Sequence, residues 1–334
     1  MNQRVHLTGL TQPELVSFSE QLGLPAYRGR QLFAALQHRR LRSFEEISDL
    51  PKDLHARLNE VATASSLNLE SRYISADGTR RYLMKTHDNL PVETVFIPEE
   101  RRDTICFSSQ SGCPLQCTFC LTAQLGLLRS LTTGEIVEQI VIALNDAYGV
   151  GKKPPRGTNL VGMGAGEPFL NFEALMKALR IMAVPEGLHI VPNRVTVSTA
   201  GIVPRILDLA KIPDRPHLAI SLAAPTDELR DELMPINKKW PLEVLLSACK
   251  EFEKTLKASI TYSKVNRSPA LSVCSNSLQA PSNSSSGHFL LIGISSSRRS
   301  SVGAASDIAK FGRCKIVPNS RMRGTTPAVE TVTR

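Results

Sequence analysis

The strand–loop–helix pattern that begins at Asp103 places the tightest constraint on the fold of this 334-residue chain. Short apolar runs between turn-forming residues predict strands at residues 103–109, 158–163, 193–201, 217–225 and 257–262. Longer amphipathic segments lie between these runs, and they predict helices. Alternating strands and helices indicate an α/β fold with a parallel sheet, in which functional residues lie at the carboxyl ends of the strands.

One connecting helix carries a clear start signal. Thr132 and Glu135 have the spacing of a capping box, in which each side chain bonds the backbone N–H of the other. Apolar residues then recur with the period of one helix face, at Ile136, Val137, Ile140, Val141 and Leu144. The pattern predicts a helix that packs this face against the sheet.

The chain divides into four predicted segments. Their bounds are 1–72, 73–102, 103–262 and 263–334. The first is a helical accessory module, in which Thr11 caps a helix that Gly23 ends, and a later helix covers residues 43–62. A strand-rich connector and the α/β segment follow. The last segment is rich in serine and poor in acidic residues, a composition that is typical of disorder.

The net charge of +9 comes almost wholly from the last quarter of the chain. Ten of the 40 lysines and arginines and two of the 31 acidic residues follow residue 260, which leaves thirty basic and twenty-nine acidic residues before it. Global charge is therefore no argument for binding nucleic acid.

The number of cysteines and the length of the apolar runs indicate where in the cell the protein is located. The chain has seven cysteines, an odd number, and neither a signal-peptide layout nor the roughly 18 apolar residues of a membrane span. We expect a cytoplasmic protein without a membrane partner, in which thiols serve as metal ligands or reactants rather than disulfides.

Three cysteines lie within eight residues, at Cys113, Cys117 and Cys120. A structural zinc site needs four ligands, and this loop has no fourth cysteine or histidine. Three thiolates on a 4Fe-4S cluster leave one iron open, and that iron can bind S-adenosylmethionine (SAM) and reduce it to a radical. The spacing predicts such a cluster; a zinc loop and a chance grouping are the alternatives.

Four motifs resemble those of the radical SAM methyltransferases that modify adenine C2 in 23S rRNA and tRNA. The motifs are VETVFIPEERRDTICFSSQSGCPLQCTFC, MGAGEPFLN, VTVSTAG and LAISLAAPTDELRDELMPIN, and the similarity extends to about Tyr262. The resemblance implies a partial (βα)6 radical SAM barrel, incomplete at its C-terminal end, with an N-terminal helical RNA-binding domain. It also implies a monomer with one 4Fe-4S cluster, SAM, 23S rRNA and tRNA substrates, and an external electron donor such as flavodoxin.

The resemblance assigns roles to eleven residues. The cluster ligands are Cys113, Cys117 and Cys120; the SAM-binding residues are Gly166, Glu167, Ser198, Ser221, Leu222 and Ala223; and the catalytic residues are Glu93 and Cys106. Many relatives have His in place of Ala223. Most of these residues also have an ordinary interpretation: a glycine-rich turn, helix-capping serines, a solvated glutamate and a core cysteine.

The implied chemistry uses two molecules of SAM. The first methylates a cysteine near the C-terminus, and the second gives a radical that removes hydrogen from that methyl group. The carbon radical adds to C2 of an unstacked adenine, Glu93 takes the C2 proton, and Cys106 frees the product by forming a disulfide.

Five arginines of the first segment cluster in sequence. They are Arg28, Arg30, Arg39, Arg40 and Arg42. They either contact RNA phosphates or form a solvated helix face.

The sequence after Tyr262 differs from that of the family. It lacks the sixth strand, the Asn-Pro and the methyl-carrying cysteine before glycine, since neither Cys274 nor Cys314 has that context. We interpret this segment as a frameshifted reading frame, which the coding DNA around codon 262 tests. The chain is then expected to cleave SAM without methylating RNA.

Two other functions fit the same residues. One is an adenine-C8 rRNA methyltransferase that confers antibiotic resistance, and the other is a non-catalytic RNA- or metal-binding relict. Product analysis separates the first from C2 methylation, and iron content separates the second from both.

Overall fold

The computed structural model describes residues 4–256 and 260–263. The predictions for the serine-rich segment, including those for Cys274 and Cys314, lie outside the described residues.

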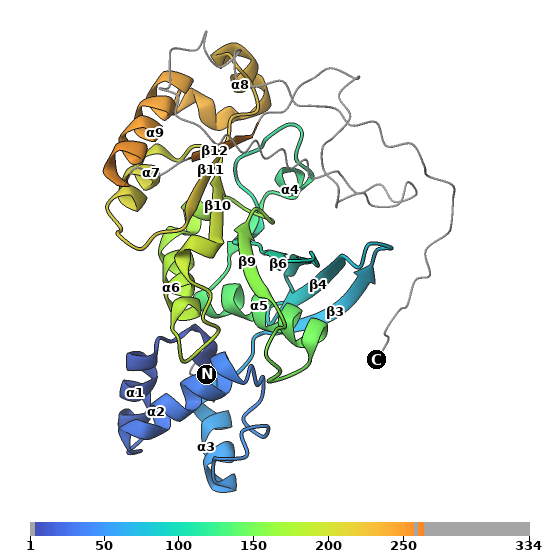
Figure 1. Cartoon of the computed structure of the whole chain (residues 1–334), viewed down its shortest axis with the longest axis vertical. Coiled ribbons are helices and arrows are strands. Elements are labelled where there is room, and N and C mark those ends of the chain that lie inside the picture. Colours follow the sequence, from blue (N-terminus) through green and yellow to red (C-terminus); the bar gives the residue numbers. More distant parts are fainter. Residues whose placement is uncertain (1–3, 257–259, 264–334) are drawn as a thin grey trace.

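An eight-stranded mixed sheet forms the centre of the molecule (Figure 1). Its strand order is β12-β11-β10-β9-β6-β5-β4-β3. The strands are β3 (Leu67–Ile74), β4 (Arg80–Thr86), β5 (Pro91–Ile97), β6 (Arg102–Cys106), β9 (Gly157–Gly162), β10 (Val195–Thr199), β11 (His217–Ser221) and β12 (Ile260–Ser263). Strands β3 to β6 pair antiparallel, whereas β6, β9, β10, β11 and β12 pair parallel. The predicted α/β class and the five parallel strands are confirmed.

The sheet does not by itself establish the expected barrel. In the described residues the strands form one open row, with β12 and β3 at its two edges. The partial (βα)6 barrel therefore stays a prediction.

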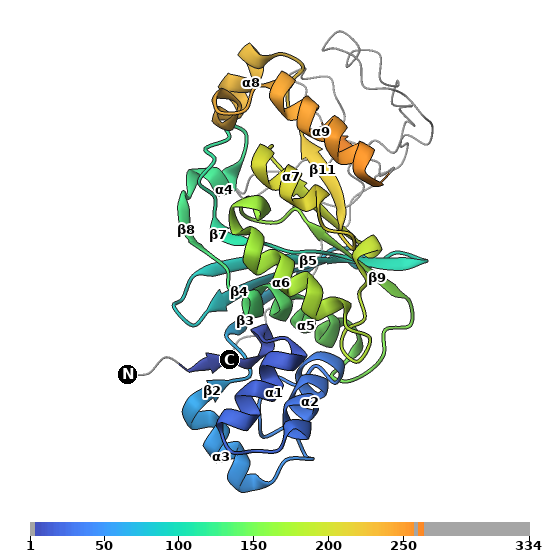
Figure 2. The same ribbon diagram turned by 90° about the vertical axis from the view of Figure 1, so that its left-hand side faces the viewer.

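Helices follow the parallel strands, and α5 packs beside α6 while α7 packs beside α9 (Figure 2). Their bounds are α4 (Leu121–Gln124), α5 (Thr133–Tyr148), α6 (Phe172–Ala183), α7 (Val203–Ala210), α8 (Asp227–Leu233) and α9 (Leu242–Leu256), with 3-10 turns at Pro168–Asn171, Pro192–Arg194 and Pro235–Lys238. The capping box of α5 is present, since Thr132 Oγ1 accepts from the Glu135 N–H at 3.2 Å and Glu135 accepts from the Thr132 N–H at 2.8 Å. All five residues of its predicted apolar face are buried.

The N-terminal residues form a helical module at one end of the molecule, blue in Figure 1. It contains β1 (Val5–His6), a 3-10 turn at Leu7–Gly9, α1 (Gln12–Gln21), α2 (Ala26–Phe33) with a π-helical turn at Ala34–His38, α3 (Lys52–Val61) and β2 (Ala62–Thr63), which pairs with β1. Thr11 caps α1 as predicted. The predicted helix over 43–62 begins only at Lys52, because Pro51 cannot continue a helix that precedes it and serves as the N-cap of α3.

A buried carboxylate joins this module to the sheet. Glu138 of α5 is 1% exposed and accepts hydrogen bonds from the backbone N–H groups of Ser66 and Leu67, at 2.9 and 2.7 Å. It also contacts His6 Nε2 at 2.8 Å and the Ser65 hydroxyl at 3.1 Å. The chain that leads from α3 into β3 is thus hydrogen-bonded to the long helix behind the sheet. None of the described helices combines the length and apolar character that a bilayer crossing requires.

We expect Glu138→Ala to lower the free energy of unfolding by about 2–4 kcal/mol, because two buried backbone donors lose their acceptor. Urea denaturation measures this change. Glu173→Ala is the matched control, since the Glu173 side chain is 80% exposed, and it is expected to change stability by less than about 0.5 kcal/mol. Equal losses in the two variants would contradict a junction role for Glu138.

Candidate active site

The three predicted cluster ligands lie in the loop of a short hairpin, between β7 (Gln110–Gly112) and β8 (Leu127–Ser130). Gly112 has φ +78°, and a Cβ there would lie 1.9 Å from the Gly126 carbonyl oxygen, so a side chain does not fit. The Cys113 N–H donates to the same carbonyl at 2.9 Å and closes the loop at its base. On its far side the loop is bonded to α8, since the Thr118 N–H donates to the Leu233 carbonyl at 3.0 Å.

The three thiols lie close enough to interact electrostatically. Burial raises the pKa of Cys113 to about 11, with Glu167 and Cys120 adding to the shift. Burial also raises the pKa of Cys117 to about 12, with Cys113 and Cys120 as the next causes. Without a metal centre, Cys113 and Cys117 are therefore neutral thiols, and a bound metal centre is what would stabilise their thiolates.

The spacing of the sulfur atoms tests which metal centre fits. A single tetrahedral zinc ion, with Zn–S bonds of ~2.3 Å, requires its sulfur ligands to lie about 3.8 Å apart. In the described part of the chain only His87, Asp88 and Glu135 bring three ligand atoms within 4.8 Å of one another, so at least one pair of the three cysteine sulfur atoms lies farther apart than that. Three cysteine donors at a wider spacing fit a 4Fe-4S cluster better than one zinc ion.

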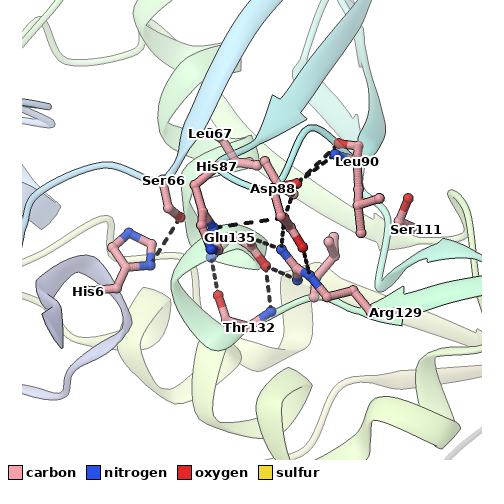
Figure 3. A network of polar contacts seen from close by, with 12 residues as sticks. His6, Ser66, Leu67, His87, Asp88, Leu90, Ser111, Arg129, Thr132 and Glu135 are labelled. Atoms are coloured by element: carbon pink, nitrogen blue, oxygen red, sulfur yellow. Dashed lines mark hydrogen bonds and ion pairs between the residues drawn. The ribbon is translucent and has the colours of Figure 1, made fainter. Parts of the chain in front are cut away.

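The His87, Asp88 and Glu135 group already has its cation (Figure 3). Arg129 of β8 donates to both oxygens of Asp88, at 2.7 and 2.8 Å, and to both oxygens of Glu135, at 2.7 and 2.8 Å. The guanidinium supplies the positive charge that a metal ion would bring. The ion pairs of Arg129 with Asp88 and Glu135 therefore attach the hairpin that carries the cysteines to the start of α5.

The hydrogen bonds of Arg129 shift both carboxyl groups. They hold the pKa of Asp88 well below its ordinary value. Burial alone would raise the pKa of Glu135, but the Arg129 hydrogen bonds and the N–H of Thr132 outweigh it and leave the pKa lowered. A carboxyl whose pKa is lowered by folding binds fewer protons in the folded state, so its contribution to stability is present above its ordinary pKa and is lost as the pH falls.

The Gly-rich turn after β9 approaches the hairpin closely. Gly166 has φ +96°, and a Cβ there would lie 2.5 Å from the Cβ of Gln110. Glu167 is 3% exposed, and its carboxylate accepts from the N–H groups of Ala200, at 2.8 Å, and Phe169, at 3.0 Å. Burial raises the pKa of Glu167 to about 7 in spite of these bonds. The carboxylate thus holds the turn against the end of β10.

The two predicted serines meet at the carboxyl ends of adjacent strands. Ser198 of β10 and Ser221 of β11 bring their Oγ atoms to 3.2 Å, and neither caps a helix. Leu222 and Ala223 follow β11 and are buried, and Ala223 has φ +61°. The structure therefore brings these four residues together, and the helix-cap interpretation of the serines is wrong.

Glu93 and Cys106 lie on neighbouring strands, β5 and β6, and the Glu93 charge adds to the raised pKa of Cys106. Burial is the main cause, and it raises that pKa to about 12. The Glu93 side chain is 44% exposed and pairs with Arg81 at 3.4 Å. A partly exposed carboxylate thus lies beside a buried, protonated thiol.

Three buried polar residues that the sequence analysis missed hold these parts together. The Ser108 hydroxyl donates to the Glu93 carbonyl at 2.6 Å and accepts from the Ala165 N–H at 2.9 Å. Gln139 of α5 accepts from the Ser108 N–H at 2.8 Å, and Gln110 accepts from the Glu167 N–H at 2.8 Å. Of these three residues, only Gln139 carried a sequence signal of burial, because it is a polar residue beside the apolar face of its helix.

The N-terminal arginines do not form one surface. Arg40 is 3% exposed and donates to the carbonyls of Gly149 and Lys152, at 2.9 and 2.6 Å, so both the phosphate-contact and the solvated-face interpretation are wrong for it. Arg42 bonds the Ser65 hydroxyl at 2.6 Å, whereas Arg30 is exposed.

Two family models match the chain. The Radical SAM superfamily matches residues 107–264, and the ribosomal RNA large subunit methyltransferase N-terminal domain matches residues 5–64. The first range contains the cysteine loop and the strand ends described above, and the second contains the helical module.

Individual relatives agree with these matches. The chain is 45% identical over 261 residues to the dual-specificity RNA methyltransferase RlmN of Geobacter sulfurreducens, covering 78% of this chain and 70% of that one. It is 46% identical over 262 residues to the probable dual-specificity RNA methyltransferase RlmN of Koribacter versatilis, covering 74% and 75%. A crystal structure of a radical SAM methyltransferase from Sphaerobacter thermophilus superimposes with a TM-score of 0.74 at 38% identity, covering 77% and 75%.

We expect Arg129→Gln to lower the free energy of unfolding by about 2–3 kcal/mol at pH 7, because Glu135 is left buried without its cation. The difference from the unmodified chain is expected to shrink below pH 4.5, where the carboxyl groups become protonated in the unfolded chain. Urea denaturation at a series of pH values measures it.

Arg205→Gln is the matched control, because Arg205 pairs only with partly exposed carboxylates at the surface. A constant difference between pH 7 and pH 3.5 for Arg129→Gln would show that the hairpin does not depend on these ion pairs.

Proposed function

The chain belongs to the RlmN family of radical SAM RNA methyltransferases, and we propose that it acts at C2 of an adenosine in 23S rRNA and in tRNA. The observation that carries the proposal is the three-cysteine loop at the same sheet edge as the ends of β9, β10 and β11. The proposed location is the cytoplasm, and the proposed form is a monomer that receives electrons from a donor such as flavodoxin.

Cys113, Cys117 and Cys120 are the proposed ligands of one 4Fe-4S cluster, which, when bound, supplies the electron that cleaves SAM. The loop brings the three thiols together on a base that Gly112 and Arg129 hold in place. The thiols of Cys113 and Cys117 are protonated near neutral pH, so loading a cluster releases their protons.

The proposed SAM site lies along the carboxyl ends of three parallel strands. Gly166 lets the Gly-rich turn pack directly against Gln110 of the cysteine hairpin, and Ser198 and Ser221 supply neighbouring hydroxyls. The Glu167 carboxylate is already bonded to two N–H groups, so we assign it the role of shaping the turn. Leu222 and Ala223 complete the site with backbone groups and an apolar wall.

Glu93 is the proposed proton acceptor and Cys106 the proposed disulfide-forming thiol. Glu93 is exposed enough to reach an incoming base, and the Ser108 bond to its carbonyl fixes its strand against the Gly-rich turn. Cys106 is buried and protonated at neutral pH, which protects it from oxidation before turnover. The helical module is the proposed RNA-binding part. The proposed fold of the radical SAM domain is a partial barrel, formed by closure of the sheet.

Methyl transfer also requires a cysteine that carries the methyl group. Cys274 and Cys314 lie outside the described residues, and their sequence contexts differ from that of the family. We therefore expect the purified chain, prepared without oxygen, to cleave SAM to 5′-deoxyadenosine under reductant but to form no 2-methyladenosine on an rRNA fragment. Mass spectrometry measures both products. Detection of 2-methyladenosine, and its loss in Cys274→Ala or Cys314→Ala, would overturn this expectation.

Cluster loading is tested by substitution of the ligands. We expect about four irons per chain in the unmodified protein and a loss of most of this iron in Cys113→Ala, Cys117→Ala or Cys120→Ala. Cys249→Ala is the matched control, since Cys249 lies on α9, outside the loop. A single zinc ion in place of iron would refute the proposed function.

A further inference from the structure

Arg230 of α8 is a buried cation with only neutral acceptors. It is 1% exposed, and its guanidinium donates to the carbonyls of Ala200, at 2.6 Å, and Leu222, at 3.0 Å, and to Asn237 Oδ1 at 2.7 Å. Within the described residues it has no carboxylate at ion-pair distance. The carboxylates of Asp227 and Asp231 are bonded to Asn237 and not to the guanidinium itself. Burying a charge without a direct ion pair is costly, so we look for a structural role of the guanidinium that offsets this cost.

The acceptors of Arg230 lie at the ends of two different strands. Ala200 directly follows β10, and Leu222 directly follows β11. A guanidinium has five donors in a rigid plane, and one such group fixes the direction of several carbonyls at once. Arg230 thus fixes the separation of the two strand ends that carry Ser198 and Ser221.

The contacts of α8 continue to the rest of the site. Ala200, which accepts from Arg230, donates its own N–H to Glu167 at 2.8 Å and so connects the arginine to the Gly-rich turn. One helical turn beyond Arg230, the Leu233 carbonyl accepts from Thr118 of the cysteine loop at 3.0 Å. The helix that carries Arg230 therefore contacts the strand ends directly, the turn through Ala200, and the loop.

We propose that Arg230 is a positioning residue for SAM, which holds the carboxyl ends of β10 and β11 in the arrangement that the cofactor requires. This inference rests on the proposed function. Arg230 acts through the two carbonyls and through Asn237, and it needs no contact with SAM itself.

Arg215, which lies just before β11, offers a matched control. It is 9% exposed, donates to the Ala210 carbonyl at 2.5 Å, and lies with its guanidinium 4.0 Å from the centre of the Phe252 ring. It precedes β11, at the end of the strand opposite to Ser221. Arg215→Gln therefore removes a buried guanidinium that bonds backbone carbonyls, but away from the proposed SAM site.

The experiment compares the full chain with Arg230→Gln, Arg230→Lys and Arg215→Gln after cluster loading without oxygen. Iron and sulfide content, the dissociation constant of SAM from equilibrium dialysis, and the change that SAM causes in the electron paramagnetic resonance signal of the reduced cluster are measured. We expect iron content close to that of the unmodified chain in all three. Both Arg230 variants are expected to bind SAM at least tenfold more weakly and to show a smaller spectral change, because lysine keeps the charge without the planar donors. Arg215→Gln is expected to melt at a lower temperature and to keep its SAM affinity within twofold.

The outcomes distinguish failure of the inference about Arg230 from failure of the proposed function on which it rests. An unmodified chain that binds neither iron nor SAM refutes the proposed function, and the inference with it. An unmodified chain that binds SAM, with Arg230 variants that bind it equally well, refutes the inference alone. An equal loss of SAM affinity in Arg215→Gln would show that lower stability alone weakens binding. Full SAM affinity in Arg230→Lys would show that the positive charge suffices. Either result overturns the positioning role. If Arg230→Gln does not fold, the lysine variant decides.

Discussion

The common direction of five strands is the constraint on which the site depends. Because β6, β9, β10, β11 and β12 are parallel, their carboxyl ends face one edge of the sheet, and whatever follows each strand meets the others there. The cysteine hairpin follows β6, the Gly-rich turn follows β9, and the two serines end β10 and β11. Residues more than a hundred positions apart in sequence thereby become neighbours without any long loop.

A parallel sheet alone would not hold that edge in one arrangement. The loops that meet there expose backbone N–H and carbonyl groups, and burial makes each unpaired group costly. Ser108, Gln110, Glu167 and Arg230 satisfy these groups across the boundaries between segments. The polar residues buried behind the site are therefore as much a part of its construction as the residues that face a ligand.

Local signals in the sequence predicted local structure well. The strands, the caps at Thr11 and Thr132 and the cysteine loop each depend on residues within a few positions of one another, and they lie where the pattern placed them. Resemblance added the residues at the strand ends, which spacing alone left open. Glu93 and Cys106 were likewise singled out by resemblance only; they lie on neighbouring strands, and their roles stay predictions.

Most of the misses share a physical cause, which is that the interaction partner lies far away in the sequence. Arg40 looked like a surface charge because its acceptors, Gly149 and Lys152, belong to a distant turn. No local signal marked Arg230, because its carbonyl acceptors follow two earlier strands. The helix expected over 43–62 is wrong for a local reason, since Pro51 lies within that range and a helix does not continue into it from the preceding residue.

The junction at Glu138 has a consequence for how a large substrate is chosen. The segment that leaves the helical module is bonded at successive N–H groups to the helix behind the sheet, so module and sheet share one rigid attachment instead of a flexible tether. For an RNA that contacted both parts, the distance between the two contacts would be set by the fold of the protein.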